Sequence, residues 1–348
     1  MPPSVLMLGW GYPPNVTGGL DVHVGELFSG LRDDLDVDAK LILPAELAPE
    51  DEPGVEGVDT GEGDIATRVD RLSDRFVELA PDYDVIHTHD WFGYGPGRKA
   101  ARKSDATWVA SFHSLASDRN IDPPQREVET ERRLANAADC NIAVSQITRG
   151  DILELYDADS RVVYNGFSTP NFTGKDVRAE HGIEGEMLFF VGRHTDQKGI
   201  SHLLYAMRKL RREDATLVVG GSGHQTKQLK RFVELVDVED DVEFVGYVAE
   251  EELGDYYRAS DAFVSPSLAE PFGITITEAL EAGTQVVSTP CGAGEILPEG
   301  CLVEVTPDSE SIVDGLDEAL DREEPPSYER RDWSEVAEDT LEVYADVA

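Results

Sequence analysis

Two glutamates eight positions apart are the residues of this chain best placed to hold a ligand. They stand in Glu270-Pro-Phe-Gly-Ile-Thr-Ile-Thr-Glu278, which follows an apolar run typical of a buried strand and crosses the start of a predicted helix. One carboxylate therefore lies at the carboxyl end of a strand and the other one turn inside the helix, where open α/β sheets bind ligands. Freed N–H groups at the helix start favour a phosphate, and the carboxylates can hold hydroxyls. This combination suits a nucleotide-sugar.

Two cations, Arg193 and Lys198, are placed to bind the anionic part of such a ligand. They occur in Val191-Gly-Arg-His-Thr-Asp-Gln-Lys-Gly199, where the arginine follows a predicted strand and the lysine precedes a helix that starts near Ile200. Each charge-assisted hydrogen bond to a pyrophosphate would contribute about 1.5–3 kcal/mol. The alternative is a pair of solvated surface charges. Lysine is scarce, with eight in 348 residues, which favours a function for Lys198.

Glycine-rich turns after two other predicted strands would let the backbone approach a phosphate closely. Thr17-Gly18-Gly19-Leu20 precedes a helix predicted to begin near Asp21, and Gly220-Gly-Ser-Gly223 precedes a helix predicted over Gln225–Val236. Glycine pairs at strand ends are common, so neither turn alone identifies a ligand. The upstream Gly9-Trp-Gly11 resembles the start of a dinucleotide fingerprint, but two prolines follow where the helix should begin, which argues against NAD.

Histidines gather at the ends of two predicted strands in the first half of the chain. They occur in His87-Thr-His89-Asp90 and Ser111-Phe-His113, and the two-residue period of a strand places His87 and His89 on one face. With His113 they could form a three-histidine metal site. Histidines at strand ends beside a ligand site more often make polar contacts, so we predict polar contacts and no metal. The DxD pattern at Asp157-Ala-Asp159 carries no information, because aspartate is so frequent here.

The charge of the chain indicates the medium in which it works. Seventy acidic residues stand against 30 basic ones, giving a formal net charge of -40, while 40% of the residues are hydrophobic. We therefore predict a folded protein adapted to concentrated salt, because at about 1 M the Debye length falls to roughly 3 Å and self-repulsion is screened. A merely acidic enzyme of ordinary salt is the alternative. The same charge argues against binding to nucleic acid or to anionic lipid.

Other bulk features favour the cytoplasm. No apolar stretch approaches the ~20 residues that span a bilayer, and no basic amphipathic helix marks a face for peripheral membrane contact. Cys140, Cys291 and Cys301 show no CxxC spacing and are odd in number, so neither a disulfide framework nor a zinc site is expected. A reducing, cytoplasmic location fits these features.

Short β-branched runs alternate with amphipathic segments along the whole chain, which predicts an α/β fold with parallel sheets covered on both faces. Two sets of six runs are separated by a Pro/Gly/Asn-rich stretch at Asn165–Gly174, so we predict two doubly wound domains at 1–167 and 168–330, with a last helix in 331–348. The acidic segment Ala45–Asp64 is predicted to be a surface loop. The predicted strands are Val5–Leu8, Lys40–Leu43, Val85–His89, Trp108–Phe112, Asn141–Val144, Val162–Tyr164, Met187–Val191, Thr216–Val219, Val242–Val245, Ala262–Ser265, Val286–Ser288 and Leu302–Val305.

Short motifs follow one another from end to end of the chain. They are Gly18-Gly19, His113, Val144-Ser145, Asn165-Gly166, Gly192-Arg193…Lys198-Gly199, Gly221…Gly223, Phe244-Val-Gly246, Glu270-Pro-Phe-Gly…Glu278-Ala and a terminal Trp333…Tyr344 helix. Their types and order resemble glycosyltransferase family 4. The resemblance implies a GT-B fold of two facing Rossmann-like domains, with the donor bound mainly by the second and the last helix packing back on the first. It also implies metal-independent transfer with retention of anomeric configuration.

The resemblance assigns a role to each matching residue. Arg193 and Lys198 would neutralise the diphosphate, Glu278 would hold the ribose hydroxyls, and Glu270 the sugar hydroxyls. His113 would contact the donor sugar near the reacting carbon. The other donor-binding positions are Gly18, Gly19 and Gly223 near the phosphates, the amides of Gly273 and Ile274, and Tyr247 and Val248 beside the base.

Two departures from the family pattern affect the choice of substrate. Asp90-Trp91 is reminiscent of glycogen and starch synthases, but the lysine that those enzymes place before Gly-Gly is replaced here by Val16-Thr17. This replacement argues against an α-glucan acceptor. The usual glycine pair before glutamate-isoleucine is Gly292-Ala-Gly294 here, so a loop near the base differs.

These observations predict a retaining, metal-independent glycosyltransferase that moves a sugar from a nucleotide-diphosphate sugar to a glycan, a lipid-linked sugar or an α-glucan. The nucleotide sugar is a co-substrate, and no cofactor is expected. A nucleotide-sugar 2-epimerase of the same fold and a non-catalytic nucleotide-sugar binder are the alternatives. A glycosidase built on Glu270 and Glu278 is a minor alternative. It would need carboxyl groups about 5–9.5 Å apart, and it would have no use for Arg193 and Lys198.

Overall fold

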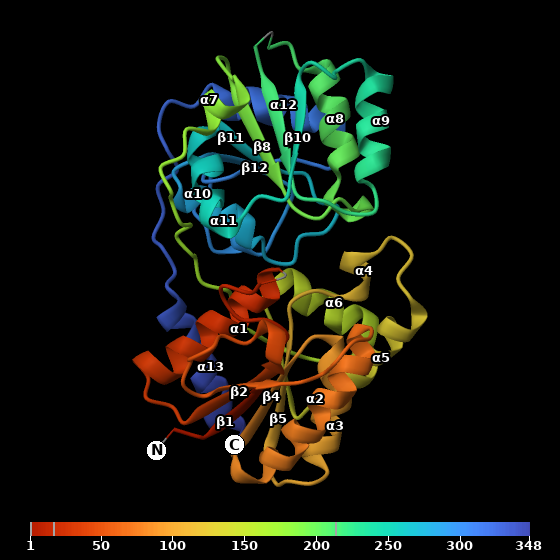
Figure 1. Cartoon of the computed structure of the whole chain (residues 1–348), viewed down its shortest axis with the longest axis vertical. Coiled ribbons are helices and arrows are strands. Elements are labelled where there is room, and N and C mark those ends of the chain that lie inside the picture. Colours follow the sequence, from red (N-terminus) through yellow and green to blue (C-terminus); the bar gives the residue numbers. More distant parts are fainter. Residues whose placement is uncertain (1, 17, 213) are drawn as a thin grey trace. The chain divides into compact units, whose positions relative to one another are not determined.

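The computed structural model describes residues 2–16, 18–212 and 214–348, and it divides into two compact units (Figure 1). Unit 1 comprises Met1–Ser117, Asp122–Gly166 and Arg331–Ala348, and unit 2 comprises Asp118–Ile121 and Phe167–Arg330. Thr17, which belongs to the predicted Gly-Gly turn, lies outside the described residues. No helix in the described ranges is long and apolar enough to cross a membrane.

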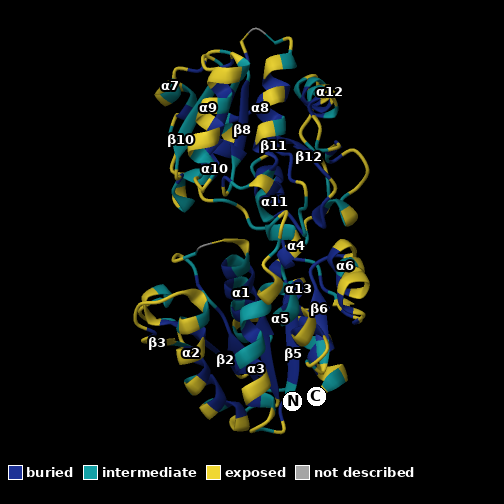
Figure 2. Cartoon of the chain, turned by 90° about the vertical axis from the view of Figure 1, so that its right-hand side faces the viewer, coloured by how far each residue is buried: buried dark blue, intermediate teal, exposed yellow. Residues whose placement is uncertain are grey.

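The sheet of unit 1 is parallel throughout, with strand order β3-β2-β1-β4-β5-β6-β7. The sequence order reverses between β1 and β4, so the loops after these two strands leave the sheet at its topological switch point. The inner strands are almost wholly buried, as the dark blue ribbons of Figure 2 show. The strands are β1 (Val5–Leu8), β2 (Ala39–Pro44), β3 (Val55–Val58), β4 (Val85–His89), β5 (Thr107–Phe112), β6 (Cys140–Ala143) and β7 (Arg161–Val162).

Helices cover both faces of this sheet, as the periodicity predicts. In α2, Val69, Leu72 and Phe76 form one buried stripe, and the Asp64 side chain caps the first turn by accepting from the Thr67 amide. The helical segments are α1 (Gly19–Ser29), η1 (Gly30–Asp34), η2 (Ala45–Leu47), α2 (Ile65–Leu79), η3 (Ala80–Asp82), η4 (Trp91–Gly93), α3 (Tyr94–Ala101), α4 (Ala116–Arg119), α5 (Gln125–Ala135), α6 (Gln146–Tyr156) and α13 (Trp333–Val347).

The last helix, α13, belongs to the core of unit 1. Asp332 and Glu335 form a capping box at its start, which fixes where the helix begins. Its apolar face supplies Val336 and Tyr344, both fully buried, to the same hydrophobic cluster as β1 and α1.

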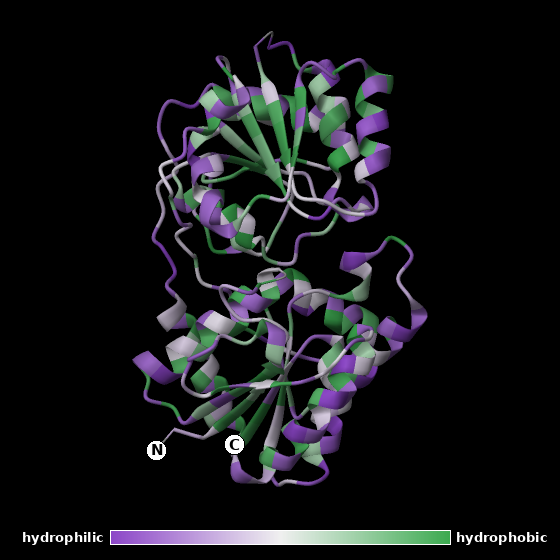
Figure 3. Cartoon of the chain, in the orientation of Figure 1, coloured by the Kyte–Doolittle hydropathy of each residue, from purple (hydrophilic) through white to green (hydrophobic). Residues whose placement is uncertain are grey.

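Unit 2 repeats the plan of unit 1 with the strand order β10-β9-β8-β11-β12-β13, again all parallel. Its switch point lies between β8 and β11. Figure 3 shows hydrophobic strands beneath helices whose outer faces are hydrophilic. The strands are β8 (Met187–Val191), β9 (Thr216–Gly220), β10 (Val242–Gly246), β11 (Ala262–Ser265), β12 (Gln285–Ser288) and β13 (Val303–Glu304), and the helical segments are α7 (Val177–His181), η5 (Asp196–Lys198), α8 (Ile200–Lys209), α9 (Thr226–Val236), α10 (Glu250–Ala259), α11 (Ile274–Glu281), η6 (Ala293–Glu295) and α12 (Ser309–Leu320).

The predicted fold class, two doubly wound parallel sheets, is confirmed. One element was predicted wrongly, because the segment Ala45–Asp64 is not simply a surface loop: it contains η2 and the edge strand β3. β3 pairs with β2 alone and is largely half-buried, so it lacks the continuous apolar run that identifies the inner strands. Gly57 lets this strand pack on η2, since an added Cβ would lie 2.9 Å from Ala45.

Candidate functional site

The loops that leave the switch point of unit 2 carry an ion pair. Lys198, at the end of the loop after β8, donates from Nζ to Oε2 of Glu270, which follows β11, at 2.7 Å. Ser267 donates to the same oxygen at 2.9 Å. Both members are largely covered, with the Glu270 side chain 11% exposed, so the two sequence motifs that were singled out separately meet at one point.

Glycine lets the loops that carry Lys198 and Glu270 approach each other. Gly199 has a φ of +62°, and an added Cβ would lie 2.0 Å from the carbonyl oxygen of Pro266, so the loops after β8 and β11 can come this close only because residue 199 is a glycine. Gly273 has a φ of +94° and starts α11, leaving the first amides of that helix unpaired within it. Ile274 is the first residue of α11, so the two predicted amides lie at a helix N-terminus that favours an anion.

Arg193 lies in the same loop as Lys198 and is exposed. Its backbone carbonyl accepts from the Thr195 amide at 2.9 Å, which shapes the turn after β8. Within the residues that the structure describes, its guanidinium forms no ion pair, whereas the Lys198 ammonium is already neutralised. The described loop after β8 therefore presents the exposed guanidinium of Arg193 beside an ammonium that is paired with Glu270.

Glu278 differs strongly from Glu270 in its surroundings. It lies one turn into α11 and is buried, and its Oε2 accepts from the hydroxyl of Tyr257 at 2.8 Å. Burial, reinforced by the nearby Glu250 carboxylate, raises the pKa of Glu278 to about 8. The carboxyl group is therefore largely protonated at neutral pH in the absence of a partner that favours its charged form.

The remaining predicted donor residues of unit 2 lie in the loops after β9 and β10. Gly223 packs on the loop after β8, because an added Cβ would lie 2.5 Å from the carbonyl oxygen of His194. Tyr247 is 79% exposed, while Val248 is buried beside Gly220. The loop of the divergent Gly292-Ala-Gly294 adjoins the Glu270-Pro-Phe-Gly273 segment after β11, since the Ala293 amide donates to the carbonyl of Phe272 at 2.9 Å.

His113, the predicted sugar-contacting residue of unit 1, follows β5 and is partly exposed. Its amide donates to Oδ1 of Asp90 at 2.8 Å, and its Nε2 lies 3.0 Å from Nδ1 of His89. Burial lowers the pKa of His113 to about 3, so the imidazole is neutral at physiological pH. Asp90 itself has a φ of +51°, which is a strained conformation for aspartate.

The histidine group has one member that the sequence argument did not include. His87 and His89 share a face as predicted, with ring centroids 4.2 Å apart. However, the ligand atoms within 4.8 Å of one another belong to His23, His89 and His113, so the grouping with His87 was wrong. His23 comes from α1, far away in sequence, and only tertiary structure brings it to the strand ends.

The group is only partly hydrogen-bonded. His89 and His113 share a hydrogen bond of 3.0 Å, while Nε2 of His23 and Nε2 of His89 are buried with no hydrogen-bond partner in the described part of the chain. A tetrahedral metal with bonds of 2.0–2.1 Å would hold neighbouring nitrogens about 3.4 Å apart, which is compatible with ligand atoms that lie within 4.8 Å of one another. That these histidines make polar contacts and hold no metal therefore stays a prediction.

Gly18 and Gly19 begin α1 at the switch point of unit 1. An added Cβ at Gly18 would meet no atom within 4 Å among the described residues other than its chain neighbours, so no packing contact seen there requires a glycine. The preceding loop is held to α1, because the Gly11 amide donates to Oδ1 of Asp21 at 2.9 Å.

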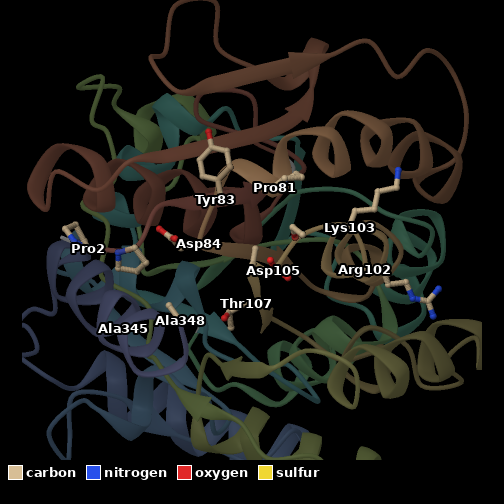
Figure 4. A pocket seen from close by; sticks show the side chains of 13 residues that line it. Pro2, Pro81, Tyr83, Asp84, Arg102, Lys103, Asp105, Thr107, Ala345 and Ala348 are labelled. Atoms are coloured by element: carbon tan, nitrogen blue, oxygen red, sulfur yellow. The ribbon is translucent and has the colours of Figure 1, made fainter.

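A pocket of about 980 Å³ lies at the amino ends of β1, β4 and β5 (Figure 4). Its lining includes Arg102 and Lys103 but also Asp84 and Asp105, so it has no single charge. It contains none of the predicted site residues, since those in unit 1 follow the carboxyl ends of the strands. We do not assign the donor to it.

The sequence argument missed Ser267 and Tyr257. Each donates to one of the two glutamates, but serine and tyrosine without a spacing rule give no signal in sequence. His23 was missed for the same reason, although its position four residues after Gly19 places it one helical turn from the predicted phosphate turn.

Comparisons with known proteins agree with this architecture. The description "Glycosyltransferase Family 4" matches residues 17–171, and "Glycosyl transferases group 1" matches residues 175–340. Among solved structures, Anabaena HepE with UDP and glucose has a TM-score of 0.80 at 20% identity, covering 99% of this chain and 100% of that one. A sucrose-phosphate synthase from Thermosynechococcus elongatus has a TM-score of 0.77 at 20% identity, covering 98% and 94%.

Proteins related in sequence match most or nearly all of the chain. An uncharacterized glycosyltransferase of Methanocaldococcus jannaschii is 30% identical, covering 98% of this chain and 97% of its own. An alpha-maltose-1-phosphate synthase of Mycolicibacterium smegmatis is 32% identical over 99% of both. A D-inositol 3-phosphate glycosyltransferase of Frankia alni is 32% identical, covering 79% and 78%. The chain belongs to the group 1 glycosyltransferases and has the GT-B fold.

Proposed function

We propose that the protein is a retaining, metal-independent glycosyltransferase that uses a nucleotide-diphosphate sugar. The observation that carries this proposal is the Lys198–Glu270 ion pair, with Arg193 exposed in the same loop at the switch point of unit 2. A pair of this kind holds a partly buried ammonium ready for an anion without leaving it uncompensated. Arg193, Lys198 and the N-terminus of α11 together would receive a diphosphate.

The proposed chemistry follows from where charge develops during transfer. As the glycosidic bond to the diphosphate breaks, negative charge grows on the departing phosphate and positive charge on the anomeric carbon. Arg193 and Lys198 stabilise the negative charge in a partly desolvated site, where such interactions are strong. Glu270, released by Lys198, is then available to accept from hydroxyls of the sugar. In unit 1, the neutral imidazole of His113 offers a polar contact to the sugar without adding a like charge.

UDP-glucose is the first donor to test, because one structural neighbour is solved with UDP and glucose. For the acceptor, the names of two relatives refer to a phosphorylated sugar or polyol, maltose 1-phosphate and D-inositol 3-phosphate. We therefore add a phosphorylated small acceptor to glycans, lipid-linked sugars and α-glucans. Val16 and Thr17, which stand where glucan synthases have a lysine, favour a small acceptor over an α-glucan.

The test is release of nucleoside diphosphate from a panel of UDP-, ADP- and GDP-hexoses in molar KCl, with each acceptor class added in turn. We expect release that depends on the acceptor, and a product in which the anomeric configuration of the donor is kept. Inversion of that configuration would contradict the retaining mechanism.

Two other outcomes would replace the proposal. A labelled donor that returns with its sugar changed at carbon 2, without any acceptor, would identify a nucleotide-sugar 2-epimerase. Tight binding of UDP with no turnover against any acceptor would identify a non-catalytic nucleotide-sugar binder.

A further inference from the structure

Four buried or partly buried histidines, half of the eight in the chain, form one continuous group in unit 1. The rings of His87 and His89 lie 4.2 Å apart, those of His89 and His113 5.3 Å apart, and those of His113 and His23 4.4 Å apart. His113 is the member assigned to the donor sugar. The other three have no role in the proposed chemistry, and they come from β4 and α1.

The last helix of the chain contacts this group at both of its ends. The Tyr344 hydroxyl lies 2.7 Å from Nδ1 of His87, and the Trp333 ring packs edge-on against His23 with centroids 5.6 Å apart. Tyr344 and His87 are both fully buried. The only apparent reason for a tyrosine here is its hydroxyl, since phenylalanine would fill the same space without an oxygen.

The hydroxyl of Tyr344 fixes the His87 ring. The other ring nitrogen, Nε2, lies 2.7 Å from Oγ of Ser111, so both nitrogens have a partner. A neutral imidazole has one N–H, so one of these hydroxyls donates to the ring and the other accepts from it. A ring held in this way cannot flip without breaking two buried hydrogen bonds. Burial also raises the pKa of Tyr344, so its hydroxyl keeps its proton.

The fixed His87 ring in turn supports the contact between His89 and His113. The His89 ring lies against the His87 ring at a tilt of 39°, and its Nδ1 makes the 3.0 Å hydrogen bond to Nε2 of His113. If His87 could rotate, His89 would lose the surface against which it rests. His113 would then keep its backbone bond to Asp90 but lose a fixed partner for its ring.

The opposite end of the group is held in a similar way. Nδ1 of His23 donates to Oδ1 of Asn165 at 2.8 Å. Trp333 lies against Gly166, where an added Cβ would be 2.8 Å from the indole ring. The helix therefore borders both the histidine on α1 and the chain segment at Asn165-Gly166.

We propose that Tyr344 is a positioning residue, whose hydroxyl holds His87 and, through the adjoining His89, keeps the His113 imidazole in the orientation needed to contact the donor sugar. The proposal rests on the proposed function, in which His113 makes that contact. It assigns the C-terminal helix a part in the reaction in addition to its packing. Tyr344 itself touches no reacting atom.

The experiment compares Tyr344→Phe with Tyr156→Phe. Tyr156 is also a buried tyrosine of unit 1, and its hydroxyl donates to a carboxylate, Oε2 of Glu131, at 2.6 Å instead of bonding to a histidine. Both variants remove one oxygen from a buried hydrogen bond, so both should lower the melting temperature. We expect Tyr344→Phe to lower kcat about 10- to 100-fold, because small displacements of a contact group carry costs of this size, with donor KM within about twofold. Tyr156→Phe should keep kcat within about twofold.

A second variant separates a specific effect on His87 from a general loss of folding. A spectroscopic measurement then tests the proposal without any donor. Ser111→Ala removes the other partner of His87, and it should give the same drop in kcat with unchanged donor KM. In histidine-labelled protein, the ring signals of His113, assigned from a His113→Gln variant, should shift or broaden in Tyr344→Phe but not in Tyr156→Phe.

Equal loss of kcat in Tyr344→Phe and Tyr156→Phe, or unchanged His113 ring signals in Tyr344→Phe, would overturn the proposal. If the unmodified protein transfers no sugar, the proposed function fails by itself. The ring signals still decide whether Tyr344 orients His113 in that case.

Discussion

The two units share one plan but place different chemistry at the same position. In both, the strand order reverses once, and the loops after the two strands beside the reversal carry polar residues. In unit 2 these residues are charged, with Lys198 and Glu270 forming an ion pair. In unit 1 the polar group at this edge of the sheet consists of imidazoles, from β4 itself and from the loop after β5, whose pKa values are lowered by burial, so they are neutral.

Under the proposed function, the two kinds of chemistry would serve different parts of the donor. Unit 2 keeps its charge compensated by pairing, which limits the cost of desolvation until an anion arrives. Unit 1 avoids that cost with groups that stay uncharged and still donate or accept hydrogen bonds. The division suits a ligand that has an anionic end and a neutral, hydroxyl-rich end.

The largest effect is expected from removing the ammonium of unit 2. Lys198→Ala should lower kcat by about 10²–10³, because the charge that it stabilises exists mainly in the transition state. Lys175→Ala is the matched control, since both lysine side chains are 25% exposed and paired with a glutamate of unit 2. The measurement is nucleoside diphosphate release at saturating donor. Similar rates in the two variants would remove Lys198 from the mechanism.

A pH-dependent effect is expected from the buried carboxyl group of unit 2. Because the pKa of Glu278 is raised to about 8, its carboxylate, the better acceptor for ribose hydroxyls, forms only as the pH rises through that value. Donor KM should therefore fall between pH 7 and pH 9. Glu278→Gln should abolish this dependence and raise KM at pH 9 by roughly 10- to 100-fold, the loss of one or two charge-assisted hydrogen bonds.

The same substitution, Glu278→Gln, should weaken donor binding at pH 9 but raise the stability of the protein at that pH. A folded-state pKa above the ordinary 4.5 means that Glu278 is best tolerated when protonated, and that its contribution to stability is lost as the pH rises from 4.5 through about 8. Glu278→Gln should therefore melt higher than the unmodified protein at pH 9, with a small difference at pH 5. A melting temperature that falls equally at both pH values would contradict a raised pKa.

A smaller effect, shared by both units, is expected from salt. We propose that the protein is adapted to concentrated salt, because its formal net charge of -40 must repel itself in dilute buffer. The melting temperature should be several degrees higher in 2 M KCl than in 0.1 M KCl, since screening is nearly complete at the higher concentration. Thermal melts at the two concentrations test this, and an equal or lower value in 2 M KCl would disprove the adaptation.

The smallest effect is expected from metal removal. The neutral histidines of unit 1 are interpreted as a hydrogen-bonded network, so treatment with EDTA should leave the transfer rate within experimental error. A rate that falls with EDTA and returns with a divalent cation would overturn this interpretation. The group of His23, His89 and His113 would then be the first place to look for the metal.

The fold was largely predictable because buried parallel strands leave a strong signal. β1, β4, β8 and β11 were predicted at the residues where they occur, since each is a short apolar or β-branched run between helical segments. β3 was not predicted, because an edge strand paired on one side needs no continuous apolar run.

The chemistry of the candidate site was predictable only in part. Loops after strands could be placed from the strand pattern alone, so Arg193, Lys198 and Glu270 were expected near one another. The contacts of Tyr257, His23 and Tyr344 were not predictable, because each joins segments brought together only by the packing of helices on a sheet. The protonation of Glu278 also depends on burial that no local pattern reveals.

The return of the chain to unit 1 has a consequence for its synthesis on the ribosome. The last 18 residues complete a core that began with Val5, whereas nearly all of unit 2 is one uninterrupted stretch, Phe167–Arg330. We expect unit 2 to reach its native state first, while the amino-terminal part waits for α13, which is translated after unit 2. Protease resistance of stalled nascent chains that lack α13 would show which part matures earlier.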